Sequence, residues 1–160
     1  MGHHALGRGP GTGRAPRGEG GHRERVRSRA LRDHGPVIGL GAVVLGTPDP
    51  VGLAAFYREL LGWTTVEGGD PRFLRLRAPE QERPGLSFQL EPDHVAPTWP
   101  PQAGTQQMQA HLDLLVDDLE HEGARAESLG ATREEHQPAD GVVVMRDPHG
   151  HPFCLFRPGH

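Results

Sequence analysis

The sequence predicts an α+β fold that repeats one plan twice: a strand, a helix and then three strands. Three observations support this prediction. Residues 42–63 and residues 111–132 share the order of apolar strand, aspartate, amphipathic helix and closing Leu-Gly. Short apolar strands follow each helix, and both copies end on a Phe-x-Leu pattern. A proline-rich stretch separates the copies, and proline is unsuited to the middle of a sheet.

The segment before the first copy differs from the rest of the chain. Residues 1–35 hold eight arginines against three acidic residues, with almost no large apolar side chains. Such a segment cannot bury enough apolar surface to offset the entropy of ordering it. We therefore predict a disordered tail over residues 1–35 and a folded domain over residues 36–160. A basic arm that binds nucleic acid is the competing interpretation, which the lack of aromatic stacking groups disfavours.

Composition excludes several classes of protein. The longest apolar run, residues 37–46, is about half of the roughly 20 residues that a membrane-spanning helix needs. Cys154 is the single cysteine, so no internal disulfide can form and a reducing cytoplasm is expected. Residues 36–160 hold nine arginines against eighteen acidic residues, and this acidic domain would repel phosphates. We expect neither a nucleic acid nor a membrane as partner.

Each predicted helix has a start signal and a stop signal. Asp49 and Asp118 precede the two helices, where a carboxylate can accept hydrogen bonds from amides of the first turn. Gly62 and Gly130 follow them, and glycine suits the left-handed position that ends a helix. Four apolar residues recur at helical spacing and should face a sheet: Leu53, Phe56, Leu60 and Leu61. Tyr57 and Arg58 are expected outside, and Trp63 in the core.

The predicted strands follow the helices in groups of three. They cover residues 63–68, 72–78 and 85–92 in the first copy, and 132–137, 141–148 and 151–158 in the second. The stretch "RFLRLR" alternates, which places its arginines on the solvent side of a half-buried sheet. The domain therefore divides into module one (36–92), a linker (93–108) and module two (109–158).

Three motifs together resemble a known superfamily: "FYRELLGW", "HLDLLVDD" and "RDPHGHPFCLF". They are similar to the glyoxalase, bleomycin-resistance and dioxygenase superfamily, also called the vicinal oxygen chelate superfamily. The resemblance covers about residues 37–157. It implies two βαβββ modules that form a curled mixed sheet around a cleft, and members are often dimers. Many members hold a divalent metal in that cleft, whereas others bind a drug or metabolite without metal.

The resemblance also implies four metal-ligand positions, which here hold Ala42, Gln89, His111 and Cys154. Only His111 is a residue that the metal enzymes use at its position. Ala42 has no donor, Gln89 offers a neutral amide, and Cys154 replaces a carboxylate by a soft thiol. We therefore expect a cleft without the full ligand set, with a divalent metal such as zinc at His111 as the alternative. An iron dioxygenase is disfavoured.

We therefore expect the protein to bind a small organic molecule in the cleft between its two modules. We also expect it to form a homodimer. We expect the cleft to be lined by Phe88, Gln89, His111, Val144, Cys154 and Phe156. Trp99 in the linker is either a lid over this cleft or a packing residue of the linker. The alternative function is a metal-dependent lyase or isomerase resembling lactoylglutathione lyase, with His111 as metal ligand or general base. Catalysis therefore stays an open question at this stage.

Two further sets of polar residues have simpler explanations. His149 and His151 lie in the turn "DPHGHP" and are expected to be exposed turn histidines. Asp117 and Asp118 could suggest paired carboxylates for acid-base work, but one is better explained as the helix cap and the other as solvated.

Overall fold

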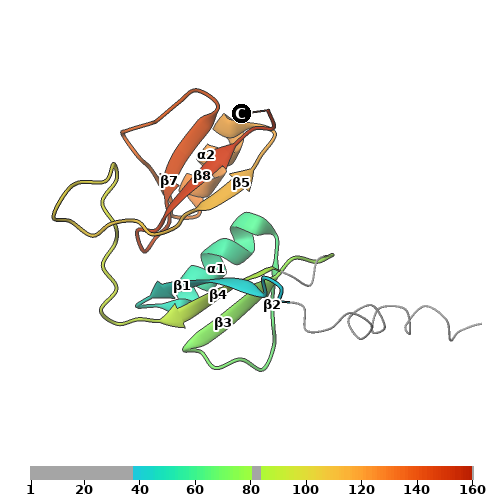
Figure 1. Ribbon diagram of the computed structural model, residues 1–160. Coiled ribbons are helices and arrows are strands. Elements are labelled where there is room, and N and C mark those ends of the chain that lie inside the picture. Colours follow the sequence, from blue (N-terminus) through green and yellow to red (C-terminus); the bar gives the residue numbers. More distant parts are fainter. Residues whose placement is uncertain (1–37, 81–83, 160) are drawn as a thin grey trace, which may run out of the picture. The chain divides into compact units, whose positions relative to one another are not determined.

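The computed structural model describes residues 38–80 and 84–159, and they contain the predicted order of elements twice (Figure 1). Module one consists of β1 (Ala42–Thr47), α1 (Pro50–Leu61), β2 (Thr64–Thr65), β3 (Phe73–Arg77) and β4 (Gly85–Leu90). Module two consists of β5 (Leu112–Leu115), α2 (Leu119–Ser128), β6 (Thr132–Arg133), β7 (Val142–Arg146) and β8 (Pro152–Phe156). The predicted tail over residues 1–35 lies outside the described residues.

Each module forms its own four-stranded mixed sheet. The strand order is β1-β4-β3-β2 in the first sheet and β5-β8-β7-β6 in the second. In both sheets the first strand of the module pairs in parallel with the last, and the other pairs are antiparallel. The prediction of two βαβββ modules is confirmed. The two sheets stay separate in the described part of the chain.

The helix boundaries follow the predicted capping residues. The Asp49 side chain accepts a hydrogen bond from the amide of Gly52 at 3.0 Å, and Asp118 accepts one from His121 at 3.0 Å. The backbone amide of His121 is the main cause that lowers the pKa of Asp118. Gly62 ends α1 with φ of 64°, a conformation that a side chain disfavours. Among the described residues, neither helix is long and apolar enough to cross a membrane.

Side chains alternate along every strand, so each sheet has two different faces. The inner faces, which pack into the core, carry Val43, Leu45, Leu74, Leu76, Leu86 and Phe88 in the first sheet and Leu112, Leu114, Val143, Met145, Phe153 and Leu155 in the second. The outer faces carry the residues between them. Register puts Ala42, Val44, Phe73, Arg75, Ser87 and Gln89 on the first outer face and Asp113, Leu115, Val142, Val144, Cys154 and Phe156 on the second.

Tyr57 lies at the centre of a core that both modules share. Its ring stacks on Phe88 of the first sheet at 5.6 Å and meets Phe153 of the second sheet edge-on at 6.4 Å. Tyr57 is fully buried, so the prediction that it lies outside is wrong. The reason is helical spacing, which places Tyr57 on the same face of α1 as Leu53 and Leu60. Both of these leucines are also buried. Trp63 packs against the core, as predicted.

A buried carboxylate joins the modules. Asp147, just after β7, accepts hydrogen bonds from the Tyr57 hydroxyl at 3.1 Å and from the backbone amides of His149 and His151 at 2.9 and 3.0 Å. The His151 ring lies between Asp147 Oδ2 and the carbonyl oxygen of Gly46, at 2.9 Å from each. Module two therefore contacts both α1 and the end of β1 through one turn.

The two turn histidines are consequently not exposed, contrary to the prediction. The side chain of His151 is 15% exposed, and its ring stacks on that of His94 in the linker at 4.6 Å. The His149 ring is hydrogen-bonded to the Thr47 hydroxyl. The prediction that these residues form a turn was right. The sequence did not reveal that residues of module one cover this turn.

Candidate functional site

Three side chains with different donor atoms meet on the second outer face: His111, Asp113 and Cys154. The parallel register of β5 and β8 places Asp113 beside Cys154, and the two-residue period places His111 on the same side as Asp113. His111 Nε2 lies 3.1 Å from Asp113 Oδ1. One donor atom from each of the three residues lies within 4.8 Å of the others. We call this group the outer-face cluster.

Solvent reaches this cluster from one side. The side chains of His111 and Asp113 are 38% and 61% exposed, whereas Cys154 is half-buried in the sheet. Burial, and then the charge and hydrogen bonding of Asp113, raise the pKa of Cys154 to about 11. The thiol is therefore protonated at neutral pH in the metal-free chain, and it makes a poor nucleophile in this state.

The first outer face carries a shallow hollow of different character. Its cavity volume is about 480 Å³, and it is lined by Gly41, Ala42, Val44, Phe73, Arg75, Leu76, Arg77, Gly85 and Ser87. Arg75 and Arg77 lie two residues apart on β3, so both extend from the same face. Neither forms an ion pair with a side chain among the described residues. The hollow combines an apolar floor with positive charge.

The other residues predicted for the cleft are distributed over three environments. Gln89 lies on the first outer face, where its amide nitrogen donates to Glu91 Oε1 at 2.6 Å. Val144 and Phe156 lie on the second outer face, with Val144 almost fully buried. Phe88 belongs to the inner face and stacks on Tyr57, so it does not line either outer face.

Trp99 contacts the loop after β6. Its indole nitrogen donates to the carbonyl oxygen of His136 at 3.0 Å, and the side chain is half-buried. Of the two predicted roles, this contact favours linker packing over a lid.

The donor chemistry decides which residues fit a metal. Ala42 has no donor and Gln89 offers only a neutral amide oxygen, so His111 and Cys154 are the strong donors among the four positions implied by the resemblance. The outer-face cluster fits a metal: imidazole, carboxylate and thiolate together are a ligand set suited to zinc. All three of its residues belong to module two.

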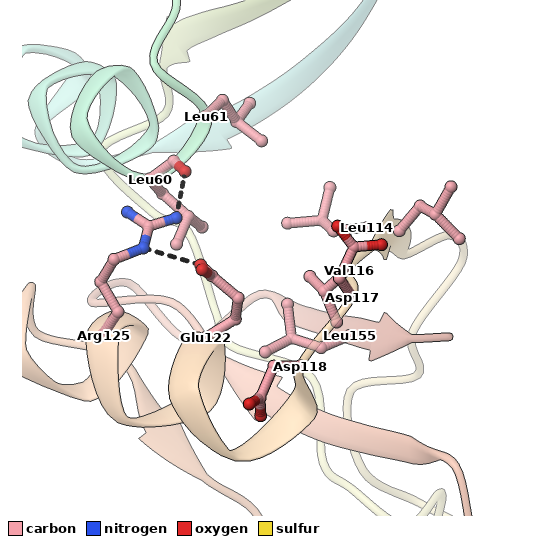
Figure 2. A pocket seen from close by; sticks show the side chains of 10 residues that line it. Leu60, Leu61, Leu114, Val116, Asp117, Asp118, Glu122, Arg125 and Leu155 are labelled. Carbon is pink, nitrogen blue, oxygen red and sulfur yellow. Dashed lines mark hydrogen bonds and ion pairs between the residues drawn. The ribbon is translucent and has the colours of Figure 1, made fainter. Parts of the chain in front are cut away.

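A further hollow of about 490 Å³ lies where the end of α1 meets β5 and α2 (Figure 2). Its apolar floor includes Leu60 and Leu155, and acidic side chains line its wall. Arg125 spans it, with Nε donating to Glu122 Oε2 at 2.7 Å and a terminal nitrogen donating to the Leu60 carbonyl at 2.7 Å. Asp118 caps α2. Arg125, Glu122 and Asp118 already form hydrogen bonds within the protein. We therefore interpret the hollow as part of the junction between the modules rather than as a ligand site.

Comparison with known proteins gives the family. The model of the glyoxalase-like domain matches residues 42–156, which is most of the chain. The chain belongs to the glyoxalase-like domain family. A search of curated proteins found no match.

Solved structures share the fold of this glyoxalase-like domain at low identity. A glyoxalase/bleomycin resistance protein/dioxygenase family enzyme from Burkholderia phytofirmans PsJN is 18% identical with a TM-score of 0.58, over 75% of this chain and 98% of that one. The fosfomycin resistance protein FosX from Listeria monocytogenes is 13% identical with a TM-score of 0.57, over 76% and 92%. Lactoylglutathione lyase from Agrobacterium tumefaciens is 19% identical with a TM-score of 0.51, over 77% and 96%.

Sequence reasoning missed Asp113 and the Arg75–Arg77 pair as site residues, and it missed Asp147 as the buried link between the modules. Asp113 could have been found, because "HLDLL" alternates and therefore puts His111 and Asp113 on one face. Asp147 had no comparable signal, since Asp-Pro is common turn chemistry.

Proposed function

We propose that the protein binds a small organic molecule against its outer faces, as a homodimer in which the first sheet of one chain faces the second sheet of its partner. The shared core is the observation that supports this most directly. The inner faces of both sheets pack into one core, so the outer faces of a single chain point away from each other. A ligand held between the two outer faces therefore needs a second copy of the chain.

Exposed apolar side chains on both outer faces support this assembly. Val44 on the first outer face is 48% exposed, and Leu115 on the second is 62% exposed. Burying such side chains against a partner is favourable, at about 25 cal/mol for each Å² of apolar surface removed from water. The two outer faces also differ in charge, since one carries Arg75 and Arg77 and the other carries Asp113.

The chemistry of the first outer face favours an anionic ligand with an apolar body. Arg75 and Arg77 can pair with a carboxylate or a phosphate-like group. Phe73 and Val44 supply the apolar surface that most small-molecule sites contain. We place this activity in the cytoplasm, because the one cysteine, Cys154, cannot form an internal disulfide.

A metal-dependent lyase or isomerase is the second candidate function, and the outer-face cluster favours it. A divalent cation held there would act as a Lewis acid on an oxygen of the bound molecule. His111 and Asp113 would then hold the cation at the surface that the ligand reaches.

The assembly is tested by measuring the molar mass of the full chain by light scattering, over a range of concentrations. The wild type is expected to have the mass of a dimer, and Val44→Arg that of a monomer. Val51→Arg is the matched control, because Val51 is 55% exposed but lies on α1. A monomeric wild type would contradict the proposal.

The shared ligand site is tested by mixing two variants. Arg75→Ala and His111→Ala should each weaken binding of an anionic aromatic probe, 1-anilinonaphthalene-8-sulfonate, followed by its fluorescence. In a mixed dimer, one of the two sites joins the intact first sheet of one chain to the intact second sheet of the other. Mixing should therefore restore part of the binding. Mixed dimers that form without any restoration would contradict a site shared between chains.

A further inference from the structure

We propose that Asp147, His151 and Gly46 form a pH-sensitive latch between the modules, closed while the His151 ring carries a proton on both nitrogens. Each ring nitrogen lies 2.9 Å from an oxygen atom: Nδ1 from Asp147 Oδ2 in the turn, and Nε2 from the carbonyl oxygen of Gly46 in β1. A carbonyl oxygen can only accept a hydrogen bond, so Nε2 must carry a proton for this contact to form. The latch does not depend on the ligand or the dimer proposed above.

The Asp147 carboxylate requires a donor at Nδ1 as well. Asp147 already accepts hydrogen bonds from the Tyr57 hydroxyl and from the amides of His149 and His151. Three such donors favour the ionised carboxylate, which has no proton to give. A neutral imidazole has one N–H and one bare nitrogen, so at one of the two contacts its lone pair would face an oxygen. The imidazolium form of His151 satisfies both contacts.

Burial makes this proton important for stability. The side chain of His151 is 15% exposed and that of Asp147 is fully buried, so water has little access to the two contacts. A buried acceptor that loses its donor is costly, because no solvent molecule replaces the lost hydrogen bond.

The latch is surrounded by titratable or charged side chains from every element that packs against it. They are Tyr57 from α1, Glu91 after β4, His94 from the linker, Glu134 after β6, Arg146 from β7 and His149 from the turn. Glu134 and Arg146 balance each other in an ion pair at 2.5 Å. The His94 ring stacks on that of His151 at 4.6 Å, and its Nε2 lies 3.0 Å from the His149 carbonyl oxygen, a contact that a neutral ring satisfies. The charge in direct contact with His151 is therefore that of Asp147, which favours the imidazolium.

Loss of one proton releases the contact with module one. Nδ1 should keep its hydrogen, because the Asp147 carboxylate is a stronger acceptor than a carbonyl group. Nε2 then becomes bare, and its hydrogen bond to Gly46 is lost. The hydrogen bond between Tyr57 and Asp147 remains. The latch therefore opens near the end of β1 and loosens the junction while both sheets keep their strand pairing.

The direction of the pH dependence follows from the two acceptors. The unfolded chain lacks them, so the folded chain holds more protons over the range in which histidine titrates, and stability falls as the pH rises. The stabilising contribution of the latch is complete below about pH 6.5, where a histidine of the unfolded chain is itself protonated, and it is lost above that range.

The test is NMR spectroscopy of the isotope-labelled, full-length chain from about pH 6 to about pH 9. At about pH 7 we expect a proton on both ring nitrogens of His151, whereas the exposed His136 should be mostly neutral. As the pH rises, the signal of the Gly46 carbonyl carbon should shift together with those of the His151 ring. This shift should be absent in His151→Gln and unchanged in His136→Gln, the matched control.

Urea denaturation measures the consequence for stability. Between about pH 6 and about pH 8.5, the unfolding equilibrium constant of the wild type should rise about tenfold more than that of His151→Gln. A neutral His151 ring at about pH 7 would overturn the proposed proton state. A Gly46 signal that does not follow the ring would overturn the latch. Both of these outcomes are read from wild-type spectra, so they can be decided even if His151→Gln does not fold.

Discussion

The molecule contains two histidine–aspartate pairs of nearly the same length in very different surroundings. His111 Nε2 lies 3.1 Å from Asp113 Oδ1 on the second outer face, and His151 Nδ1 lies 2.9 Å from Asp147 Oδ2 between the modules. The first pair is 38% and 61% exposed, and the second is 15% and 0% exposed. Since the residue types and distances are nearly the same, any difference in role between the two pairs must come from their surroundings.

The difference lies in the bonds that are already made. Asp147 accepts hydrogen bonds from Tyr57 and two backbone amides besides its contact with the His151 ring. The other nitrogen of that ring faces the Gly46 carbonyl. Asp113 contacts only His111 and the Cys154 thiol among the described side chains. A satisfied pair stabilises the fold, whereas a pair with unused donor atoms can still bind a ligand.

The largest effect is expected from removing the buried carboxylate. Asp147→Ala leaves Tyr57 and the His151 ring without their acceptor, and it should lower the free energy of unfolding by about 3–5 kcal/mol. Asp113→Ala is the matched variant on the exposed pair, and it should change stability by less than about 0.5 kcal/mol. Urea denaturation of both variants measures the contrast. Equal losses of stability in the two variants would contradict the conclusion that only the buried pair stabilises the fold.

Zinc should stabilise the protein by binding at the exposed His111–Asp113 pair, and not at the buried His151–Asp147 pair. Free zinc at about 100 times its dissociation constant should raise the free energy of unfolding by about 2.7 kcal/mol, because the folded state alone holds the preformed site. A chelator should remove this gain. Thermal unfolding with and without zinc is the measurement, and a full gain in Asp113→Asn would point to binding elsewhere.

Tyr57 should make stability fall at alkaline pH. Burial, and then the charge and hydrogen bond of Asp147, raise the pKa of Tyr57 well above its ordinary value. Below about pH 10 both the folded and the unfolded chain keep the phenol protonated. Above it the unfolded chain loses the proton first, so the stabilising contribution of Tyr57 declines as pH rises towards the folded pKa.

Tyr57→Phe measures this contribution directly. It should cost about 1–2 kcal/mol at neutral pH, because a buried hydrogen bond to a charged group is lost. The cost should shrink above about pH 10, where the wild type loses its advantage. Tyr57 is the one tyrosine of the chain, so tyrosinate absorbance reports on it alone. Absorbance that rises near pH 10 while the protein stays folded would contradict the buried network.

The smallest effect concerns the reactivity of Cys154. With its pKa raised to about 11, the folded, metal-free chain should react with iodoacetamide at pH 8 about two orders of magnitude more slowly than the unfolded chain. Asp113→Asn should speed the reaction of the folded chain, since Asp113 contributes to the raised pKa. Mass spectrometry of the alkylated protein follows both rates. An unchanged rate in the variant would mean that Asp113 does not influence the pKa of the Cys154 thiol.

Much of the fold could be predicted because its signals are local. The caps at Asp49 and Asp118, the stop at Gly62 and the alternation in "RFLRLR" each depend on a few neighbouring residues, and the structure confirms them. The repeat then fixed the order of elements.

The site was less predictable because it depends on how the modules pack. Ala42, Gln89 and Cys154 lie in strands and His111 immediately precedes β5, but whether their side chains share a cleft depends on which faces form the core. Phe88 and its neighbour Gln89 were both assigned to the cleft, although neighbouring residues of a strand point to opposite faces, and Phe88 lies on the inner face. The burial of Tyr57 and His151 depends on contacts between residues 90 or more positions apart, such as Tyr57 with Asp147.

The repeat also conceals an asymmetry between its helices. Tyr57 and Ala126 lie the same number of residues after their capping aspartates, and both are fully buried. The two helices therefore contribute differently to the shared core. Helix α1 donates a hydrogen bond to Asp147 of module two through the Tyr57 hydroxyl, whereas the matching residue of α2 is an alanine with no polar group to offer.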